Sequence, residues 1–308
     1  MVIFMNSLVF SLLAAGCTSL SSLFFRKNAD SSTASSSPSG YLVLFYFSSF
    51  ILSFLLYPDI WQVNINLIIL IIGGCVGLLS STLMLLTSRA LKQGPAGLTF
   101  AFQNASAIFP GLILFLFLGS DFGFSCSYLQ LAGMALVLFG LFLGAKKESA
   151  NYPQTSSKWL KYALACFMVQ ILALTFIQAR CILFDCGEMG GLFSDFTFTE
   201  VDDVWFMPGQ FGASFIMQTV IFLRENKKFQ KSEVIYGCSG GIANFSSTCL
   251  LLLATKLAIP FEKGILFPCF AVASMILCNL WANRLYNEKF NLKTNALCSC
   301  GIFMAVSG

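Results

Sequence analysis

The chain has 308 residues, of which 57% are hydrophobic and only 10% are charged, and its formal net charge is +4. A soluble globular domain carries about 25% charged residues, so this composition excludes a soluble globule and indicates a membrane protein. Histidine is absent from the sequence, which excludes catalysis by histidine and metal sites that need imidazole ligands.

Apolar segments long enough to cross a bilayer recur along the whole sequence. A transmembrane helix needs about 17–25 predominantly apolar residues. The last segment has a short apolar core, so nine spans are the alternative to ten. We predict an all-α polytopic membrane protein with ten transmembrane helices at residues 3–25, 41–57, 67–88, 96–118, 128–145, 159–183, 204–223, 234–255, 261–283 and 292–308.

One stretch of sequence occurs twice. Residues 73–97, GGCVGLLSSTLMLLTSRALKQGPAG, and residues 240–264, GGIANFSSTCLLLLATKLAIPFEKG, share a glycine pair, Ser-Ser-Thr, a leucine-rich run, a lysine and a proline. The match needs a one-residue gap before Ser80 and another before Pro95, and chance similarity between membrane helices is the alternative. A duplicated segment retains such an order. We therefore predict two halves, residues 1–147 and 158–308, joined by a cytoplasmic linker at residues 148–157.

Basic residues alternate between the two sides of the predicted membrane. Fifteen of the 18 lysines and arginines follow or flank the odd-numbered connections, and Arg180, Lys256 and Lys263 are the exceptions. The positive-inside rule makes the odd connections cytoplasmic and places both termini outside. Five helices per half then force the second half to enter from the opposite side, which predicts two inverted five-helix repeats.

Two turns and the order of the helices carry a family resemblance. The third helix runs through a short turn into the fourth in RALKQGPAGLTFAFQNASAIFPGL, and the chain closes with TKLAIPFEKGILFPCFAVASMILCNLWANRLYNEKFNLKTNALCSCGIFMAVSG, where Asn287-Glu288 lies in the last turn. This pattern resembles the drug/metabolite transporter superfamily in its EamA-like branch. The resemblance implies a carrier of small metabolites such as amino acids, nucleotide-linked compounds or S-adenosylmethionine, or of drugs.

The resemblance and the inverted halves together predict a secondary transporter of the inner (plasma) membrane. It would move a small polar solute, zwitterionic or anionic, by alternating access. The expected partners are the lipid bilayer, the solute and a coupling ion or counter-substrate, with no nucleic acid and no cofactor, and the chain would be a monomer or homodimer. No P-loop occurs and the twelve cysteines show no metal-site spacing, so we expect neither an enzyme nor a metal site.

Two other functions are kept as alternatives. A drug or amine exporter of the same superfamily is the nearer one, but related proton-coupled exporters use an acid inside the first helix. The first acid here is Asp30, which we expect in a loop. A non-transporting membrane scaffold is the other, and it has no need of duplicated halves.

Six side chains are the predicted substrate ligands. An ionisable group at membrane depth is a functional hypothesis by default, and arginine and lysine bind carboxylates or phosphates. The alternatives are structural: amides join helices, an acid after Pro260 stabilises a helix N-terminus, and a terminal cation extends to the interface. The predicted site lies between the third, fourth, eighth and ninth helices, with help from the first and sixth, and uses Gln103, Asn104, Asn244, Glu262, Lys263 and Arg180.

Two prolines lie inside apolar spans. Pro110 falls in the fourth predicted helix and Pro268 in the ninth. A proline within a helix removes a hydrogen bond and bends the helix. We predict a kink at each.

Cysteine labelling tests the predicted topology. Ser35 lies in the Ser-rich segment after the first helix and Glu200 in the acidic loop after the sixth. A membrane-impermeant maleimide should label a cysteine at Ser35 only from the cytoplasmic side and one at Glu200 only from outside, measured above the labelling of the parent's native cysteines. Labelling of both positions from the same side would overturn the ten-span topology.

Overall fold

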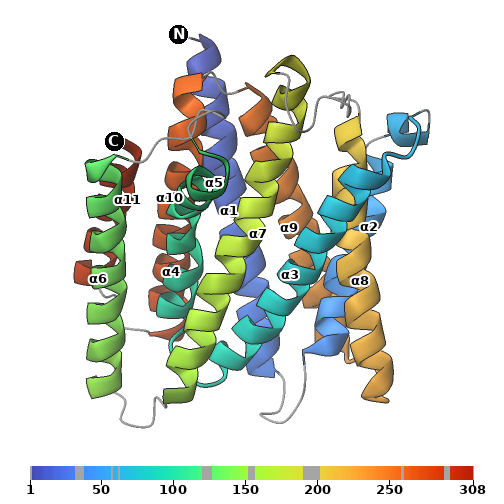
Figure 1. The fold of residues 1–308 in the computed structure, drawn as a ribbon. Helices are drawn as coiled ribbons and strands as arrows, with labels where there is room; N and C mark the ends of the chain where they lie inside the picture. The colour runs from blue at the N-terminus through green and yellow to red at the C-terminus, as the bar shows by residue number, and fades with distance from the viewer. Residues whose placement is uncertain are drawn as a thin grey trace.

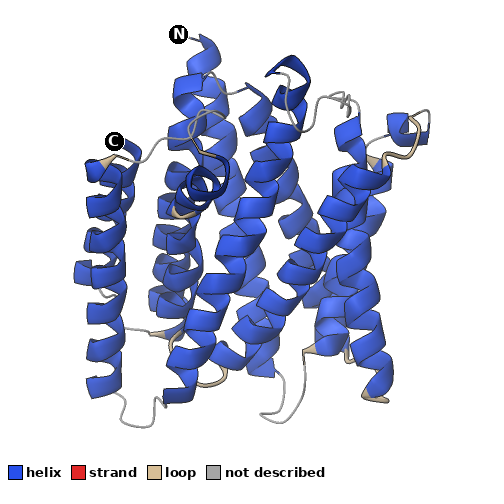
Figure 2. Cartoon of the chain, in the orientation of Figure 1, coloured by secondary structure: helices blue, strands red, loops and turns tan. Residues whose placement is uncertain are grey.

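The structure, a computed structural model, is built from helices (Figure 2). It describes residues 2–31, 38–56, 58–61, 63–119, 127–151, 157–189, 202–257, 260–287 and 292–307, and no strand occurs among them. The helices are α1 (Val2–Ser31), α2 (Ser39–Leu55), η1 (Pro58–Trp61), α3 (Leu67–Leu91), α4 (Ala96–Ala105), η2 (Ser106–Ile108), α5 (Pro110–Leu118), α6 (Tyr128–Asn151), α7 (Ser157–Met189), η3 (Asp202–Trp205), α8 (Phe206–Arg224), α9 (Lys231–Leu257), α10 (Pro260–Tyr286) and α11 (Leu292–Ser307), where η marks 3-10 helices.

A helix lies over each predicted apolar segment, but several helices continue beyond it. α1 extends to Ser31, so Asp30 lies in its last turn and not in a loop as expected. α6 continues to Asn151, into the predicted linker, and α7 continues to Met189. Hydropathy marks only the part of a helix that suits hydrocarbon, whereas backbone hydrogen bonds continue the helix into the polar layer.

The protein is membrane-embedded. Large apolar side chains cover its outer surface, as shown by Phe117 at 84% exposure and Tyr128 at 94%. In the part of the chain that the structure describes, two shorter apolar helices, Ser39–Leu55 and Tyr128–Gly144, accompany six that are long and apolar enough to cross a membrane. The six are Ser7–Asp30, Leu67–Leu91, Ala96–Phe117, Lys158–Arg180, Asp203–Arg224 and Lys231–Thr255.

Apart from α4 and α5, which follow one another, successive α-helices run alternately up and down the bundle (Figure 1). α6 and α11 pair at one edge, and α2 and α8 pair towards the other. Between them, α1 packs on α9 and α10, while α7 packs on α3 and on α4 and α5. The N-terminal end of α1 and the C-terminal end of α11 lie at the same end of the bundle.

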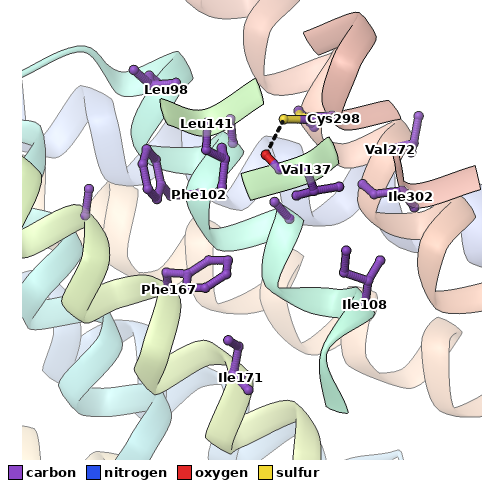
Figure 3. Close-up of a cluster of buried hydrophobic side chains, with 14 of the residues drawn as sticks. Leu98, Phe102, Ile108, Val137, Leu141, Phe167, Ile171, Val272, Cys298 and Ile302 are labelled. Carbon is purple, nitrogen blue, oxygen red and sulfur yellow. Dashed lines mark hydrogen bonds between the residues drawn. The ribbon is translucent and has the colours of Figure 1, made fainter. Parts of the chain in front are cut away.

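Two hydrophobic clusters fill the space between the helices. The first joins α4, η2, α6, α7, α10 and α11, with Phe102 and Phe167 at its centre (Figure 3). In it, the Cys298 thiol donates to the Val137 carbonyl oxygen at 3.9 Å. The second joins α1, α2, α3, α4, α8, α9 and α10 around aromatic rings such as Tyr41. Lipid tails are as apolar as these side chains, so close van der Waals contact is what favours helix association here.

Helices α3 and α8 cross with their backbones in direct contact. A Cβ atom at Gly73 would overlap the carbonyl oxygen of Phe206, and one at Gly77 would overlap that of Gln210. Ser214 Oγ lies 2.8 Å from the Gly77 carbonyl oxygen and 2.9 Å from that of Gln210, so its proton serves either acceptor. Glycine allows this approach because it has no side chain to separate the helices.

Helices α2 and α9 cross in the same way. A Cβ atom at Gly237 would lie 2.8 Å from the Tyr41 carbonyl oxygen, and one at Gly241 would overlap that of Phe45. Ser49 Oγ lies 2.9 Å from the Gly241 carbonyl oxygen and 3.0 Å from that of Phe45. The two crossings therefore use the same pair of devices, a Gly-x-x-x-Gly stripe on one helix and a serine hydroxyl on the other.

Basic residues gather at one end of the bundle, which we name the basic end. Arg26 Nη1 donates to the Leu91 carbonyl oxygen at 2.9 Å and the guanidinium lies 5.1 Å from the centre of the Tyr286 ring, so the ends of α1, α3 and α10 meet there. Burial and the neighbouring Lys227 ammonium lower the pKa of Lys92. The helix ends and turns at this end carry Arg26, Lys27, Arg89, Lys92, Lys158, Lys161, Arg224, Lys227, Lys228, Lys231 and Arg284.

Alanine at the glycine crossings should destabilise the protein. Gly77→Ala and Gly241→Ala each place a methyl group against a carbonyl oxygen, and overpacking of this kind costs roughly 1–3 kcal/mol. Gly16→Ala is the matched control, because nothing lies within 4 Å of its added Cβ atom. Thermal unfolding in detergent should show lower midpoints for the first two variants and no decrease for the control. Equal midpoints for all three would contradict the crossing geometry.

Candidate functional site

The fourth predicted span is broken near its middle. α4 gives way to the 3-10 helix η2, and α5 begins at Pro110. Proline has no N–H, so the Ser106 carbonyl cannot receive the usual helical bond; it accepts instead from the Phe109 N–H at 3.2 Å. The kink predicted at Pro110 is confirmed. At 1.5 Å per residue the break lies about 18 Å from Ala96, near the middle of a ~30 Å hydrocarbon core.

Gln103 joins α4 to α3 and α7. Its Nε2 donates to Thr87 Oγ1, which donates in turn to the Leu83 carbonyl oxygen at 2.8 Å. Thr87 Oγ1 also lies 3.7 Å from Cys166 Sγ, and Ser106 Oγ donates to the backbone oxygen of Gln103 at 2.5 Å. The amide nitrogen of Gln103 thus makes a hydrogen bond between helices. This is the structural role that the sequence offered as the alternative to binding substrate.

Asn104 is half-buried one residue further along α4. Within the described part of the chain its side chain makes no hydrogen bond or ion pair. It lies one turn after Phe100, whose ring packs edge-on against Trp281 of α10 at 5.8 Å. Trp281 Nε1 donates to Ser19 Oγ of α1 at 3.0 Å. The Asn104 amide therefore lies on the side of α4 that faces α10 and, behind it, α1.

Asn244 of α9 resembles Asn104 in its burial and in its hydrogen bonding. It is half-buried, and its side chain makes no hydrogen bond or ion pair among the described residues. The Gly240 carbonyl oxygen, one turn before it, accepts from Ser21 Oγ at 3.2 Å, and Ser247 Oγ, one turn after it, donates to the Ala14 carbonyl oxygen at 2.8 Å. Asn244 therefore lies on the side of α9 that faces α1. A polar group without a partner at this depth costs roughly 1–3 kcal/mol unless water or a solute satisfies it.

Arg180 lies towards the other end of the bundle from Arg26 and is buried. Its side chain is 4% exposed, and Nη1 lies 3.3 Å from Oδ1 of Asp203. The guanidinium carbon lies 4.4 Å from the centre of the Phe206 ring. A cation that extends to the interface would keep its head group in water. The structure therefore favours an internal role for Arg180 over the interfacial one.

Glu262 and Lys263 lie in the first turn of α10, and their side chains fall outside the described residues. The Leu266 carbonyl oxygen, one turn later, accepts from Ser11 Oγ of α1 at 3.1 Å. This contact places the start of α10 beside the N-terminal half of α1, away from the basic end. α10 continues without interruption through Pro268, so the second predicted kink does not break the helix as Pro110 does.

The structure does not bring together the four predicted ligands whose side chains it describes. Asn104 and Asn244 flank α1 and α10 in the interior, Gln103 is engaged in a network, and the other three lie towards the end opposite the basic end. Within the residues that the structure describes, no group of three or more Cys, Asp or Glu side chains could hold a metal ion.

Sequence reasoning missed the partners of the predicted residues. A search restricted to amides and charges passes over hydroxyls and thiols inside apolar spans. The missed residues are Thr87 and Cys166, which lie beside Gln103, and Asp203, which pairs with Arg180.

Comparisons with known proteins inform the fold alone. Comparison of the sequence with protein families and with curated proteins finds no match. A solved structure described only as a crystal structure of a protein is similar over nearly the full length, covering 98% of this chain and 96% of its own, with a TM-score of 0.60 at 13% identity. This similarity shows that the arrangement of helices is one that an experimentally determined protein adopts.

Alanine substitutions should show that the two adjacent amides of α4 contribute differently to stability. Gln103→Ala removes a bond between helices, and such bonds in membrane proteins contribute about 0.6 kcal/mol on average. Asn104→Ala removes a side chain with no protein partner among the described residues, so the stability should not fall. Thermal unfolding of the two variants in detergent measures the difference. A larger loss for Asn104→Ala than for Gln103→Ala would contradict these assignments.

Proposed function

We propose that this chain is a secondary carrier of the drug/metabolite transporter type, with ten spans arranged as two inverted five-helix repeats. It moves a small polar solute, zwitterionic or anionic, across the inner (plasma) membrane by alternating access. Amino-acid and nucleotide derivatives are the solute classes, S-adenosylmethionine-like compounds included. The observation that carries the proposal is the pair of matching helix crossings, in which Ser214 meets Gly77 and Ser49 meets Gly241.

The matching crossings support a duplication. α3 and α9 are the third helices of the two proposed halves, and α8 and α2 are the second helices. Each third helix thus presents its glycine stripe to the second helix of the other half. If the two proposed halves are exchanged, one crossing becomes the other, and so does the hydrogen bond of its serine. In this pairing Gly77 corresponds to Gly241. The sequence match aligned the pair Gly73-Gly74 with the pair Gly240-Gly241 instead, so the two alignments differ by about one helical turn.

The packing of the other helices supports the same exchange. α1 packs on α9 and α10, and its counterpart α7 packs on α3 and on the broken span of α4 and α5. The remaining pairs, α2 with α8, α4 with α10 and α6 with α11, each join equivalent helices of the two halves. Inverted repeats of this kind form many secondary carriers, in which one half rocks against the other around a site near the midplane.

Orientation follows from the basic end. Positively charged residues are retained on the cytoplasmic side, so the basic end faces the cytoplasm and both termini face outward. The solute site is then the space around Asn104 and Asn244, on either side of α1 and α10 and close to the broken helix. Broken helices at the midplane supply polar backbone and side-chain groups to the substrates of carriers.

The alternatives have weaker support. A drug or amine exporter would need an acid inside the first helix, whereas in the described part of α1 the acid is Asp30, in the last turn beside Arg26 at 3.3 Å. A scaffold would give no reason for two uncommitted amides, Asn104 and Asn244, in the interior. The carrier explains both the symmetry and the amides.

Uptake into proteoliposomes tests the proposal. Labelled amino acids, nucleotides and S-adenosylmethionine are supplied under proton, sodium and counter-substrate gradients, and at least one should accumulate. Asn104→Ala and Asn244→Ala should each reduce its uptake about two- to tenfold, the range expected for one lost hydrogen bond. Glu262→Gln tests another of the predicted ligands, and unchanged transport would remove Glu262 from the site. If no solute moves under any gradient, the carrier proposal fails.

A further inference from the structure

Arg180 places a cation inside the protein near the end of the span Lys158–Arg180. The residue is 3% exposed. Taking a charge out of water costs several kcal/mol unless excellent pairing and hydrogen bonding offset it. A buried arginine in a membrane protein is therefore retained for a purpose, and the quality of its pairing indicates which purpose.

The pairing of Arg180 with protein groups is incomplete. Nη1 lies 3.3 Å from Oδ1 of Asp203, whereas a charge-assisted hydrogen bond spans about 2.7–2.9 Å. Neither Nη1 nor Nε of Arg180 makes a hydrogen bond to a residue that the structure describes, although both are buried. These two nitrogens carry three of the five N–H groups of a guanidinium. Within the described part of the chain, buried donors thus remain beside one carboxylate.

Phe206 holds the cation without using these donors. Its ring is 1% exposed, and the guanidinium carbon lies 4.4 Å from the ring centre. An aromatic face attracts a cation through its quadrupole and accepts no conventional hydrogen bond. The charge of Arg180 is thereby held in place while its N–H groups stay available to oxygen acceptors.

Arg26 provides the comparison at the basic end. Its Nε likewise makes no hydrogen bond, but its Nη1 donates to the Leu91 carbonyl oxygen at 2.9 Å. Its acid partner, Asp30, is on the same helix and 42% exposed, against 9% for Asp203. Arg26 therefore has a backbone acceptor and a solvated partner, and among the described residues Arg180 has neither.

We propose that Arg180 is an anion-binding site that takes the acidic group of the solute, a carboxylate or a phosphate, in exchange for Asp203. This inference rests on the proposed function for the solute, but the site binds an anion whether or not transport follows. An oxyanion offers two or more oxygens to the three unbonded N–H groups, which the single contact with Asp203 does not satisfy. Asp203 is then an internal competitor, and its release breaks the ion pair between α7 and η3.

Anion binding to the purified full chain in detergent tests the site. The probes are inorganic phosphate and succinate, titrated by isothermal calorimetry at constant ionic strength, with choline as a cationic control. We expect one or both anions to bind and choline not to bind, and the arm that binds identifies the acidic group. Arg180→Gln should weaken binding about 10- to 100-fold, as expected for the loss of charged hydrogen bonds.

Asp203→Asn is the decisive variant, because it removes the competing charge and keeps the shape. It should bind the anion several-fold more tightly than the parent, which a purely structural ion pair would not produce. Arg26→Gln is the matched control and should retain the parent's affinity. Unchanged or weaker binding by Asp203→Asn, equal losses in the two arginine variants, or no binding by the parent would each overturn the site.

A failure of the transport proposal and a failure of the anion-site proposal can be told apart. Uptake of a labelled solute with no anion binding at Arg180 would remove the site and leave the carrier. Anion binding that follows the expected order of variants, without uptake of any solute, would leave the site and remove the carrier.

Discussion

Close backbone contact at two glycine crossings is the interaction on which the rest of the structure depends. In a bilayer, apolar surface gains nothing from leaving lipid for protein, so helices associate where their backbones approach most closely. The stripes that begin at Gly73 and Gly237 allow that approach, and Ser214 and Ser49 each add a hydroxyl contact at the point of crossing. Because each crossing joins one half of the chain to the other, these contacts fix the relative position of the halves.

The lack of water inside the bilayer also decides where polar side chains lie. Most described hydroxyls bond to a carbonyl within one turn or on a neighbouring helix, as Thr87 and Ser247 do. Against this background, Asn104 and Asn244 stand out because their amides make no such bond to a described residue, and Arg180 stands out because its bonding to the described residues is incomplete. In the proposed carrier these are the groups that a solute satisfies: amides in the interior and a cation towards the outer end.

The broken span gives the interior its polar character. Pro110 removes one helical bond, and the chain responds with a short 3-10 segment between α4 and α5. The break lies beside Gln103 and Asn104, so backbone irregularity and side-chain polarity occur together. α10, which packs against α4, has no such break between Pro260 and Tyr286. The two proposed halves are therefore alike in packing and unlike in this detail.

The sequence by itself determined that the protein is helical and membrane-embedded and where its helices lie, because a bilayer sets the length and composition of a span. It also identified Pro110 as a kink, since the missing N–H acts locally. Only the tertiary structure decided what the polar residues contact. Gln103 and Asn104 are adjacent amides in one helix, yet one meets Thr87 and the other meets no described partner, because a 100° rotation turns them towards different neighbours. Likewise, no local pattern joins Arg180 to Asp203, since it is the fold that brings α7 beside η3.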